Sequence, residues 1–502
     1  MQALYEDGLP AVSDGACPFY SFESIDTLHY YITNGAYGTN TKYLCESTKG
    51  TLAYMTADAG QVLEDEAFAW KVLYDKMTGL YFIRNLKSGK YFRHTGSSVA
   101  LAESQPSTKE AIQLMPARIT MDFTVGETTI TKKPYWFARG DRKETPNVIA
   151  IDGASKTTVS TPGLDFTNKA TKQFWLIYSA EEMKQLWQAK YNYDTNRLRQ
   201  LVEGSLALVA SDHHQLSDGA DADFSEKVAA AQALLTDPEA TPTTDLQPAI
   251  GQLLTDIAAY LALIEANTDE QPLNISFILE NPDLQSKTGW TGLSEVTDGT
   301  AQFTSKFAMS QKTISLPAGN YALIAYGFQR PGKLTAVNND FAEGTNSVSS
   351  RMMANSASKY IQHIAESGRT EKLNQGGTEQ QVKGIYQPTN AVAAAAYFRN
   401  GYYENRMPFT LEKSGILIVK LQNTKTIAND WTVCGGFQLL YYGASMTSDG
   451  IEQMKNEELR MKNGADAMYD LSGRQLKISG LEELQNLPPG VYIIDGRKVI
   501  VN

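Results

Sequence analysis

Gln173-Phe174-Trp175-Leu176-Ile177 ends the last of three related segments, and these segments decide the fold of the first third of the chain. Phe68-Ala69-Trp70 and Ile112-Gln113-Leu114 take the same place in the two earlier segments. Each segment opens with an aromatic β-like run and continues with a second run about ten residues later. The opening runs are His29–Asn34, Leu80–Asn85 and Pro134–Arg139, and the second runs are Lys42–Leu44, Lys90–Phe92 and Asn147–Ile149. A threefold repeat of this kind predicts a β-trefoil over residues 20–178.

The same segments resemble the ricin-type lectin trefoil, in which a Gln-x-Trp strand closes each repeat. Gln173-Phe174-Trp175 fits that pattern, Phe68-Ala69-Trp70 keeps only the tryptophan, and Ile112-Gln113-Leu114 has neither residue in place. In that family the tryptophan is a core residue, and an Asp and an aromatic residue of each repeat hold the sugar. The Asp cannot be placed in the first two repeats. The resemblance therefore implies a sugar-binding module, while a structural or protein-contact module fits the same strands.

From Ala180 to about Asn267 the apolar period changes to three and four residues, which indicates amphipathic helices. Ser179 is placed to cap the first helix, the second starts near Asp223, and the third runs from Asp245 to Ile264. Pro238 is expected to end the second helix. Residues 180–267 are therefore predicted to form a three-helix bundle that acts as a spacer between two β-domains.

Residues 270–443 are predicted to form a second β-domain. Asn274–Phe277 and Thr288–Trp290 resemble the opening of galactose-binding-like jelly-roll domains, a family of carbohydrate-binding modules found beside bacterial glycan-degrading enzymes. The resemblance continues through Ile314–Tyr321, Ala325–Arg330, Tyr397–Asn405 and Asn429–Val433. Gly435-Gly436 is a departure, because relatives usually carry an Asp-Asn-like pair there.

The end of the chain is predicted to hold a small β-module after a charged linker over residues 444–468. Asp495-Gly496, between two β-branched runs, is a strong hairpin signal. Residues 469–502, with Tyr469–Arg474 and Leu487–Val501, resemble the C-terminal module of secreted and surface proteins of the Bacteroidetes. That resemblance implies export to the cell surface or beyond. The start of the chain lacks the basic and apolar regions of a signal peptide, so a mature form is expected.

Composition excludes several classes of function. A net charge of −11 argues against a nucleic-acid binder, and no apolar run reaches the ~20 residues of a membrane helix. Of the three cysteines, Cys17 and Cys45 are a possible disulfide pair, whereas Cys434 lies in an apolar stretch and is expected to be buried.

No catalytic or metal-binding pattern stands out. Glu64-Asp65-Glu66 is predicted to be a solvated loop, and His213-His214 a polar connection between helices that lacks a third metal ligand. None of the five histidines lies near a nucleophile motif. No cofactor is predicted, although the jelly-roll resemblance allows a structural calcium ion near Asp298, Gly299 and Asp430.

Binding is the function that remains, because aromatic rings stack on sugars while polar groups meet the hydroxyls. The predicted carbohydrate-binding residues are Tyr326, Arg330, Tyr402, Tyr403 and Asp430. The rings of Tyr397–Asn405 are interpreted as a strand interrupted at Gly401, which leaves open whether they face solvent or fill the core. We expect a secreted, non-catalytic protein whose partner is an oligosaccharide or polysaccharide. The alternatives are an adhesion or structural protein that binds other proteins, and a glycoside hydrolase with a carboxylate pair assembled from distant strands.

Overall fold

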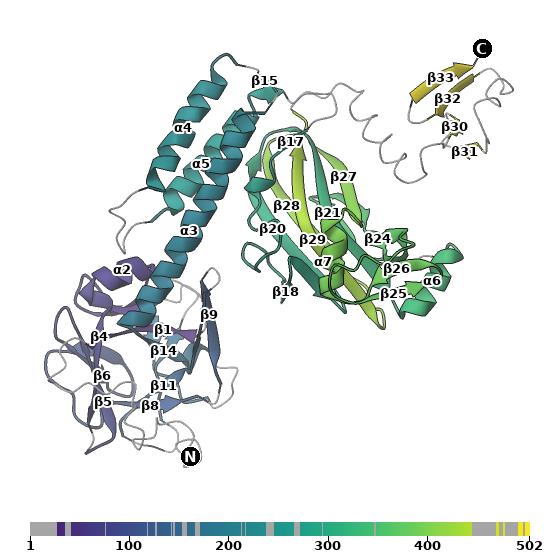
Figure 1. Cartoon of the computed structure of the whole chain (residues 1–502). Helices are drawn as coiled ribbons and strands as arrows, with labels where there is room; N and C mark the ends of the chain where they lie inside the picture. The colour runs from purple at the N-terminus through teal and green to yellow at the C-terminus, as the bar shows by residue number, and fades with distance from the viewer. Residues whose placement is uncertain are drawn as a thin grey trace. The chain divides into compact units, whose positions relative to one another are not determined.

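The chain is a multidomain, mainly β protein with a helical middle region (Figure 1). The computed structural model describes residues 28–443 except 36–41, 76, 118, 126–127, 142, 144–145, 153–157, 166–170, 212, 216, 237–244, 266–271, 294 and 346–347. Beyond residue 443 it describes four short strands. Contacts divide the chain into two units. The first unit consists of the chain up to Asn196 together with Thr236–Gln247, and the second consists of Arg197–Leu235 together with the chain from Pro248 onward.

Six strands of the first unit close into a ring. Each pairs antiparallel with the next, and the last returns to the first. In order around the ring the strands are β1 (Tyr30–Asn34), β4 (Trp70–Asp75), β5 (Leu80–Asn85), β8 (Ile112–Pro116), β11 (Tyr135–Arg139) and β14 (Trp175–Ser179). The result is a trefoil-like barrel filled mainly by aromatic and β-branched side chains.

One hairpin accompanies each successive pair of ring strands. The three hairpins are β2 (Lys42–Glu46) with β3 (Leu52–Thr56), β6 (Tyr91–His94) with β7 (Val99–Ala102), and β12 (Ala150–Asp152) with β13 (Thr158–Ser160). A further hairpin of β9 (Met121–Val125) and β10 (Thr128–Lys132) lies between the second and third repeats, and helix α2 (Ala59–Glu64) lies within the first.

Two equivalent tryptophan hydrogen bonds make the repeat visible at the residue level. Trp70 Nε1 donates to the carbonyl of Leu44 at 3.0 Å, and Trp175 Nε1 donates to the carbonyl of Ile149 at 2.8 Å. Both indoles are fully buried. Leu114 takes the same place in the second repeat and has no donor to offer. The closing tryptophans are thus core residues, as the sequence predicts.

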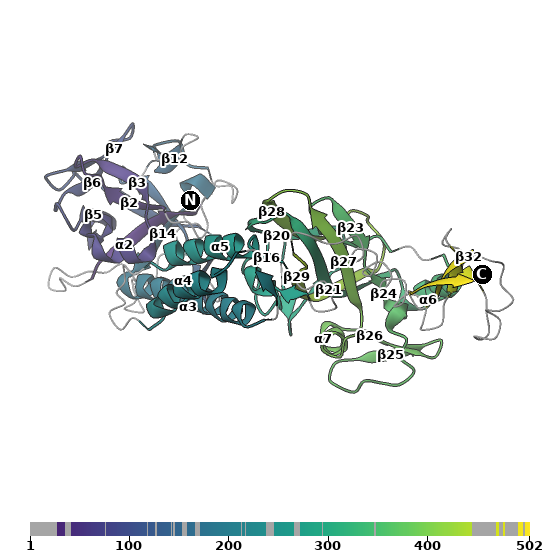
Figure 2. The ribbon, with the colours of Figure 1, turned by 90° about the horizontal axis from the view of Figure 1, so that it is seen from above.

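Three helices follow the barrel and lie side by side in both views (Figures 1 and 2). They are α3 (Ala180–Val209), α4 (Ala220–Leu234) and α5 (Gln247–Leu261). The predicted cap of α3 is present: Ser179 Oγ accepts from the Glu182 amide, and Glu182 Oε2 accepts from the Ser179 amide. Helix α4 begins three residues earlier than predicted, and Pro238 lies outside the described residues. His214–Gln215 forms β15, which pairs with β16 (Ile264–Glu265).

In the second unit, α3 packs against the segment that leads into the following β-domain. Arg197 donates to the carbonyls of Phe277, Ile278 and Leu279, which belong to or follow the short helix η5 (Ser276–Ile278). The ring of Phe277 lies where a side chain on Gly204 would have to go. These contacts require two features on one face of α3: the long, positively charged side chain of Arg197, and a glycine at position 204, which has no Cβ.

The β-domain of the second unit consists of two sheets that pack face to face. The larger sheet contains β17 (Leu273–Asn274), β18 (Val296–Thr297), β19 (Thr300–Phe303), β21 (Gly319–Pro331), β24 (Gln362–His363), β27 (Glu404–Leu411) and β29 (Asp430–Tyr441). The smaller sheet has the order β20 (Phe307–Leu316), β28 (Gly415–Asn423), β22 (Arg351–Ala354) and β23 (Ala357–Tyr360). Cys434 Sγ meets Met309 Sδ at 3.5 Å between them, so Cys434 is a buried thiol, as predicted.

The part of the segment from Tyr397 to Tyr403 is not a strand, so that prediction is wrong there, and only Glu404 and Asn405 belong to a strand. Helix α7 (Ala391–Arg399) contains Tyr397 and Phe398, and a turn leads from it to β27. Asn390 caps the helix by accepting from the Ala393 amide, and the alanine-rich run that follows has the highest helix propensity. Helix α6 (Leu334–Ala342), the short helix η6 (Ile364–Ser367) and a hairpin of β25 (Glu379–Val382) with β26 (Ile385–Pro388) complete this region.

The terminal β-module forms a four-stranded sheet. Its strands are β30 (Met468–Asp470), β31 (Gln475–Leu476), β32 (Gly490–Ile494) and β33 (Arg497–Val501). Strands β32 and β33 pair antiparallel with Ile494 opposite Arg497, so the predicted hairpin is confirmed. Its turn residues, Asp495 and Gly496, lie outside the described residues, as does the predicted linker over 444–468 except for Met468, the first residue of β30.

Candidate functional site

The predicted carbohydrate-binding residues lie in or next to one aromatic core cluster in the second unit. The cluster contains Phe328, Val337, Ile364, Ala394, Tyr397, Phe398, Tyr403, Trp431 and Val433. Tyr326 and Tyr402 are half-buried at its margin. Within the described part of the chain, no hydrogen bond or ring contact joins any two of Tyr326, Arg330 and Tyr402.

Tyr403 and Asp430, two of the predicted carbohydrate-binding residues, are buried and do not face solvent. Each side chain is only 2% exposed. Tyr403 Oη donates to the Ile364 carbonyl at 2.7 Å, and burial raises the pKa of the phenol. Asp430 accepts hydrogen bonds from Gln329 Nε2 and Asn423 Nδ2, both at 2.8 Å, and burial raises the pKa of its carboxyl group. Both side chains therefore hold the core together.

The other three predicted residues have protein partners too. Tyr326 Oη donates to Glu404 Oε2 at 3.2 Å, and its pKa is raised, first by burial and then by the Glu404 charge. The Arg330 guanidinium lies over the Trp431 ring at 5.2 Å, and its pKa is lowered by burial. Tyr402 Oη accepts from Arg369 at 2.6 Å. Trp290 and Trp431 are buried, as predicted.

The residues suggested as calcium ligands are engaged elsewhere. Asp298 pairs with Arg399 at 3.0 Å, and the carboxylate of Asp430 faces two amide donors instead of other oxygen atoms. Over the residues that the structure describes, no group of three or more His, Cys, Asp or Glu side chains is arranged to hold a metal ion.

The cysteines and histidines of the described residues serve structure. Cys45 is a buried free thiol, and burial raises the pKa of Cys45 to about 12. Cys17, its possible disulfide partner, lies outside the described residues. His213 lies against Tyr260 and Asp221, with Nε2 2.9 Å from Tyr260 Oη. His94 is buried with Nε2 3.1 Å from the Asn147 carbonyl.

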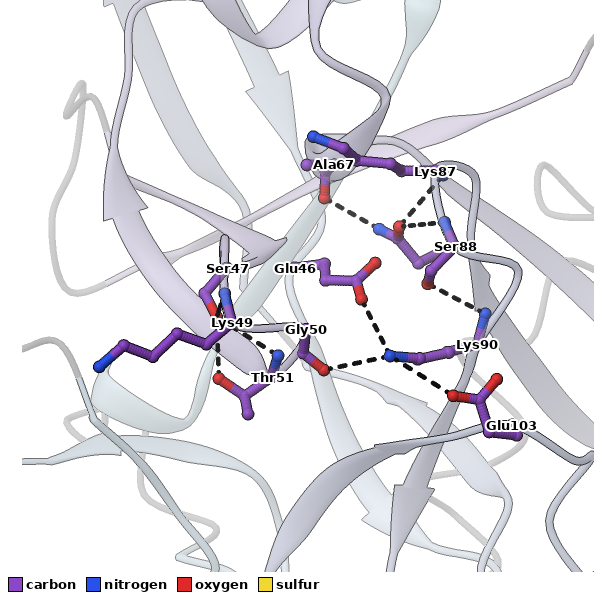
Figure 3. A network of polar contacts seen from close by, with 11 residues as sticks. Glu46, Ser47, Lys49, Gly50, Thr51, Ala67, Lys87, Ser88, Lys90 and Glu103 are labelled. Atoms are coloured by element: carbon purple, nitrogen blue, oxygen red, sulfur yellow. Dashed lines mark hydrogen bonds and ion pairs between the residues drawn. The ribbon is translucent and has the colours of Figure 1, made fainter.

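A polar network joins the first two repeats of the barrel (Figure 3). Lys90 Nζ lies 3.4 Å from Glu46 Oε1 and 3.5 Å from both Glu103 Oε1 and the Gly50 carbonyl. The hydrogen bond to Glu46 is the main cause that raises the pKa of Lys90. Glu46 is buried, and its Oε2 has no hydrogen-bond partner among the described residues. The network ties the β2–β3 hairpin to the start of β6, which gives it a structural role.

The smaller sheet of the second unit has an exposed surface that was not predicted from the sequence. Leu417, Val419 and Leu421 of β28 point inward and are fully buried, so the alternate residues point outward. We call this outward side of β20, β28, β22 and β23 the outer face. Strand register places three rows across it: Ala308, Gln422, Arg351 and Tyr360; then Ser310, Lys420, Met353 and Ser358; then Lys312 and Ile418.

Arg351 and Tyr360 form a pair at one end of the outer face. The guanidinium carbon lies 4.8 Å from the centre of the Tyr360 ring, and Arg351 Nη2 donates to Tyr360 Oη at 3.1 Å. The tyrosine is 53% exposed, the largest exposed fraction of any large aromatic residue described. The pair thus offers an exposed ring edged by hydrogen-bond donors.

This fold and these surfaces define a multidomain, mainly β protein with a helical middle region. Among the described residues, no helix is long and apolar enough to cross a membrane. No protein-family model matches the chain, and no curated protein matches it.

Two of the solved structures that are similar to this chain show how distant the similarity is. One is a lectin of Polyporus squamosus bound to the human-type influenza-binding epitope Neu5Aca2-6Galb1-4GlcNAc, at 14% identity and a TM-score of 0.20, over 48% of this chain and 78% of that chain. The other is Cry35Ab1, at 10% identity and a TM-score of 0.20, over 87% of this chain and 93% of that chain.

Proposed function

We propose that the chain is an exported, non-catalytic carbohydrate-binding protein. The proposal assigns a ricin-type trefoil to residues 20–178, a helical spacer to 180–267, a galactose-binding-like jelly roll to 270–443, a linker to 444–468 and a secretion-tail-like module to 469–502. The closed six-stranded ring with three hairpins supports the trefoil, and the two facing sheets support the jelly roll.

The exposed Arg351–Tyr360 pair on the outer face is the observation that favours sugar binding most. A sugar ring has an apolar side of C–H groups, which packs well on an aromatic ring. A guanidinium has five N–H donors, and Arg351 uses one of them on Tyr360 Oη. The remaining donors, together with Gln422 and Ser358 in adjacent positions, are available for sugar hydroxyls. An exposed β-sheet with such groups suits an extended saccharide chain.

Affinity measurements on the full chain test this proposal. Isothermal titration calorimetry and affinity gel electrophoresis against plant, host and microbial polysaccharides are expected to reveal at least one ligand. Tyr360→Ala is expected to weaken that binding about tenfold, because ring stacking contributes roughly 1–1.5 kcal/mol. Tyr360→Phe keeps the ring and is expected to keep most of the affinity.

Met55→Ala is the matched control, since Met55 is a similarly exposed side chain in the barrel. Its affinity is expected to equal that of the unchanged chain. Absence of binding to every polysaccharide would refute the proposed function. Undiminished binding by Tyr360→Ala would remove the outer face as its site.

Protein binding is the second candidate function, favoured by two exposed isoleucines on the same face. Ile416 is 55% exposed and Ile418 37% exposed on β28. Adjacent apolar side chains on an exposed sheet are typical of protein contacts. If the outer face binds a protein, Ile416→Ser with Ile418→Ser weakens that contact while leaving polysaccharide binding unchanged.

A further inference from the structure

The outer face carries three outward-pointing cations on three neighbouring strands. Lys312 lies on β20, Lys420 on β28 and Arg351 on β22. Lys312 and Arg351 are exposed and Lys420 is half-buried. None of the three makes an ion pair with a described residue.

Strand register places these cations on one diagonal. Lys312 lies opposite Ile418, two residues from Lys420, and Lys420 lies opposite Met353, two residues from Arg351. Diagonal neighbours in an antiparallel sheet are about 7–8 Å apart. Arg351 then lies directly opposite Tyr360. We call the line of Lys312, Lys420 and Arg351 the cation stripe, and it leads to the exposed ring.

The sheet that carries the cation stripe has no negative charge of its own. None of β20, β28, β22 and β23 contains an Asp or Glu, although the whole chain has a net charge of −11. A fourth cation, Lys359 on β23, turns the other way and donates to the Arg406 carbonyl at 2.8 Å. The local charge is therefore opposite to that of the whole chain, and it favours an anionic partner.

We propose that the outer face binds an acidic polysaccharide, one whose sugar residues carry carboxylate or sulfate groups at regular intervals. The cation stripe meets successive anionic groups along the polymer, and Tyr360 stacks on a sugar ring at the end of the stripe. The inference rests on the proposed carbohydrate binding and names its ligand class. The exposed ring beside Arg351 favours a glycan over other polyanions, because a ring placed there adds stacking to charge.

Binding to four polymers distinguishes the chemistry. Polygalacturonate carries carboxylates, fully methyl-esterified polygalacturonate removes them, dextran sulfate carries sulfates, and dextran is neutral. The full chain is expected to bind polygalacturonate or dextran sulfate at least tenfold more tightly than its uncharged counterpart. Raising NaCl from about 50 mM to about 500 mM is expected to remove most of that preference, because exposed charges are screened by salt.

Neutralising variants test the cation stripe directly. Lys312→Gln, Lys420→Gln and Arg351→Gln are each expected to weaken binding to the acidic polymer about threefold, the effect of one exposed ion pair. Lys413→Gln is the matched control: it changes the net charge by the same amount at an exposed turn next to β28 and is expected to have no effect. Unchanged melting temperatures confirm that every variant is folded.

Four results decide the proposal. A preference for acidic polymers that the three variants lose and Lys413→Gln keeps supports it. Equal binding of neutral and acidic polymers overturns it while leaving carbohydrate binding intact, and absence of binding to every polysaccharide overturns both. Tighter binding to phosphatidylserine vesicles or to DNA than to polygalacturonate overturns it in favour of a different anionic partner.

Discussion

At the scale of single residues, His363 is a buried titratable group whose protonation is expected to make the stability of the second unit depend on pH. Its ring is 1% exposed, stacks on Phe341 at 4.8 Å and accepts the Ala365 amide at Nδ1. Burial lowers the pKa of His363 to about 4, although the charge of Asp340 on α6 opposes the shift. Glu366 of η6 accepts a hydrogen bond from the backbone amide of His363.

We therefore expect the second unit to lose stability as the pH falls from about 6.5 to about 4. In that range the unfolded chain takes up a proton on His363 that the folded chain does not. The loss should be on the order of 2 kcal/mol, after part of the pKa shift is discounted for solvent screening. Differential scanning calorimetry at steps of half a pH unit measures it. His363→Gln cannot titrate and should show a shallower dependence; an identical dependence would contradict the assignment.

At this scale, the orientation of individual side chains could not be predicted from the sequence. Tyr403 and Asp430 have the residue types of a sugar site, yet each is buried and satisfied by a specific partner. Tyr403 adopts φ of +60°, which turns the chain sharply after α7 and directs the ring into the core. Residue types and motifs can be recognised in the sequence, but they do not determine the backbone turns that orient a side chain.

At the scale of elements, the contact between α3 and η5 depends on a glycine. A Cβ on Gly204 would meet ring atoms of Phe277 at 2.1–2.5 Å. Replacing glycine by alanine within a helix normally stabilises a protein by about 1 kcal/mol. At Gly204 we expect the opposite, a lower melting temperature and a loss of roughly 1–3 kcal/mol, because the ring has to move out of its packed position.

Gly251 of α5 is the matched control, because nothing lies within 4 Å of a Cβ built there. Gly251→Ala is expected to raise the melting temperature while Gly204→Ala lowers it, in thermal denaturation followed by circular dichroism. If both substitutions stabilise the chain, α3 does not pack against Phe277 as described.

Elements with unambiguous local signals were predictable, and those with two compatible readings were not. Ser179 and Glu182 give α3 a start that the structure reproduces to the residue. In β28, by contrast, Ile416, Leu417, Ile418 and Val419 are all apolar, so alternation cannot tell which side faces the core. That ambiguity concealed the outer face, although the absence of Asp and Glu from its strands was visible in the sequence.

At the scale of the whole molecule, the threefold repeat was predictable because it repeats a core interaction. Trp70 and Trp175 bond the second strand of their own repeat in the same way, and the aromatic opening strands all become ring strands. The division of contacts was not predictable. It falls within α3, between Asn196 and Arg197, and Arg197 hydrogen-bonds to the carbonyl of Phe277 in the η5 segment.

The two buried thiols report on the two units separately. Cys45 belongs to the first unit and Cys434 to the second, and burial raises the pKa of each, so neither exposes a reactive thiolate while folded. With Cys17 replaced by Ser, maleimide labelling in increasing urea, followed by peptide mass spectrometry, measures when each thiol becomes reactive.

Gly204→Ala should accelerate labelling of Cys434 alone. Trp70→Leu gives the first repeat the residue type that the second repeat has at the equivalent position. It should accelerate labelling of Cys45 alone, because losing the buried indole and its hydrogen bond costs about 3 kcal/mol of stability. Equal acceleration of both thiols by either substitution would show that the two units do not open separately.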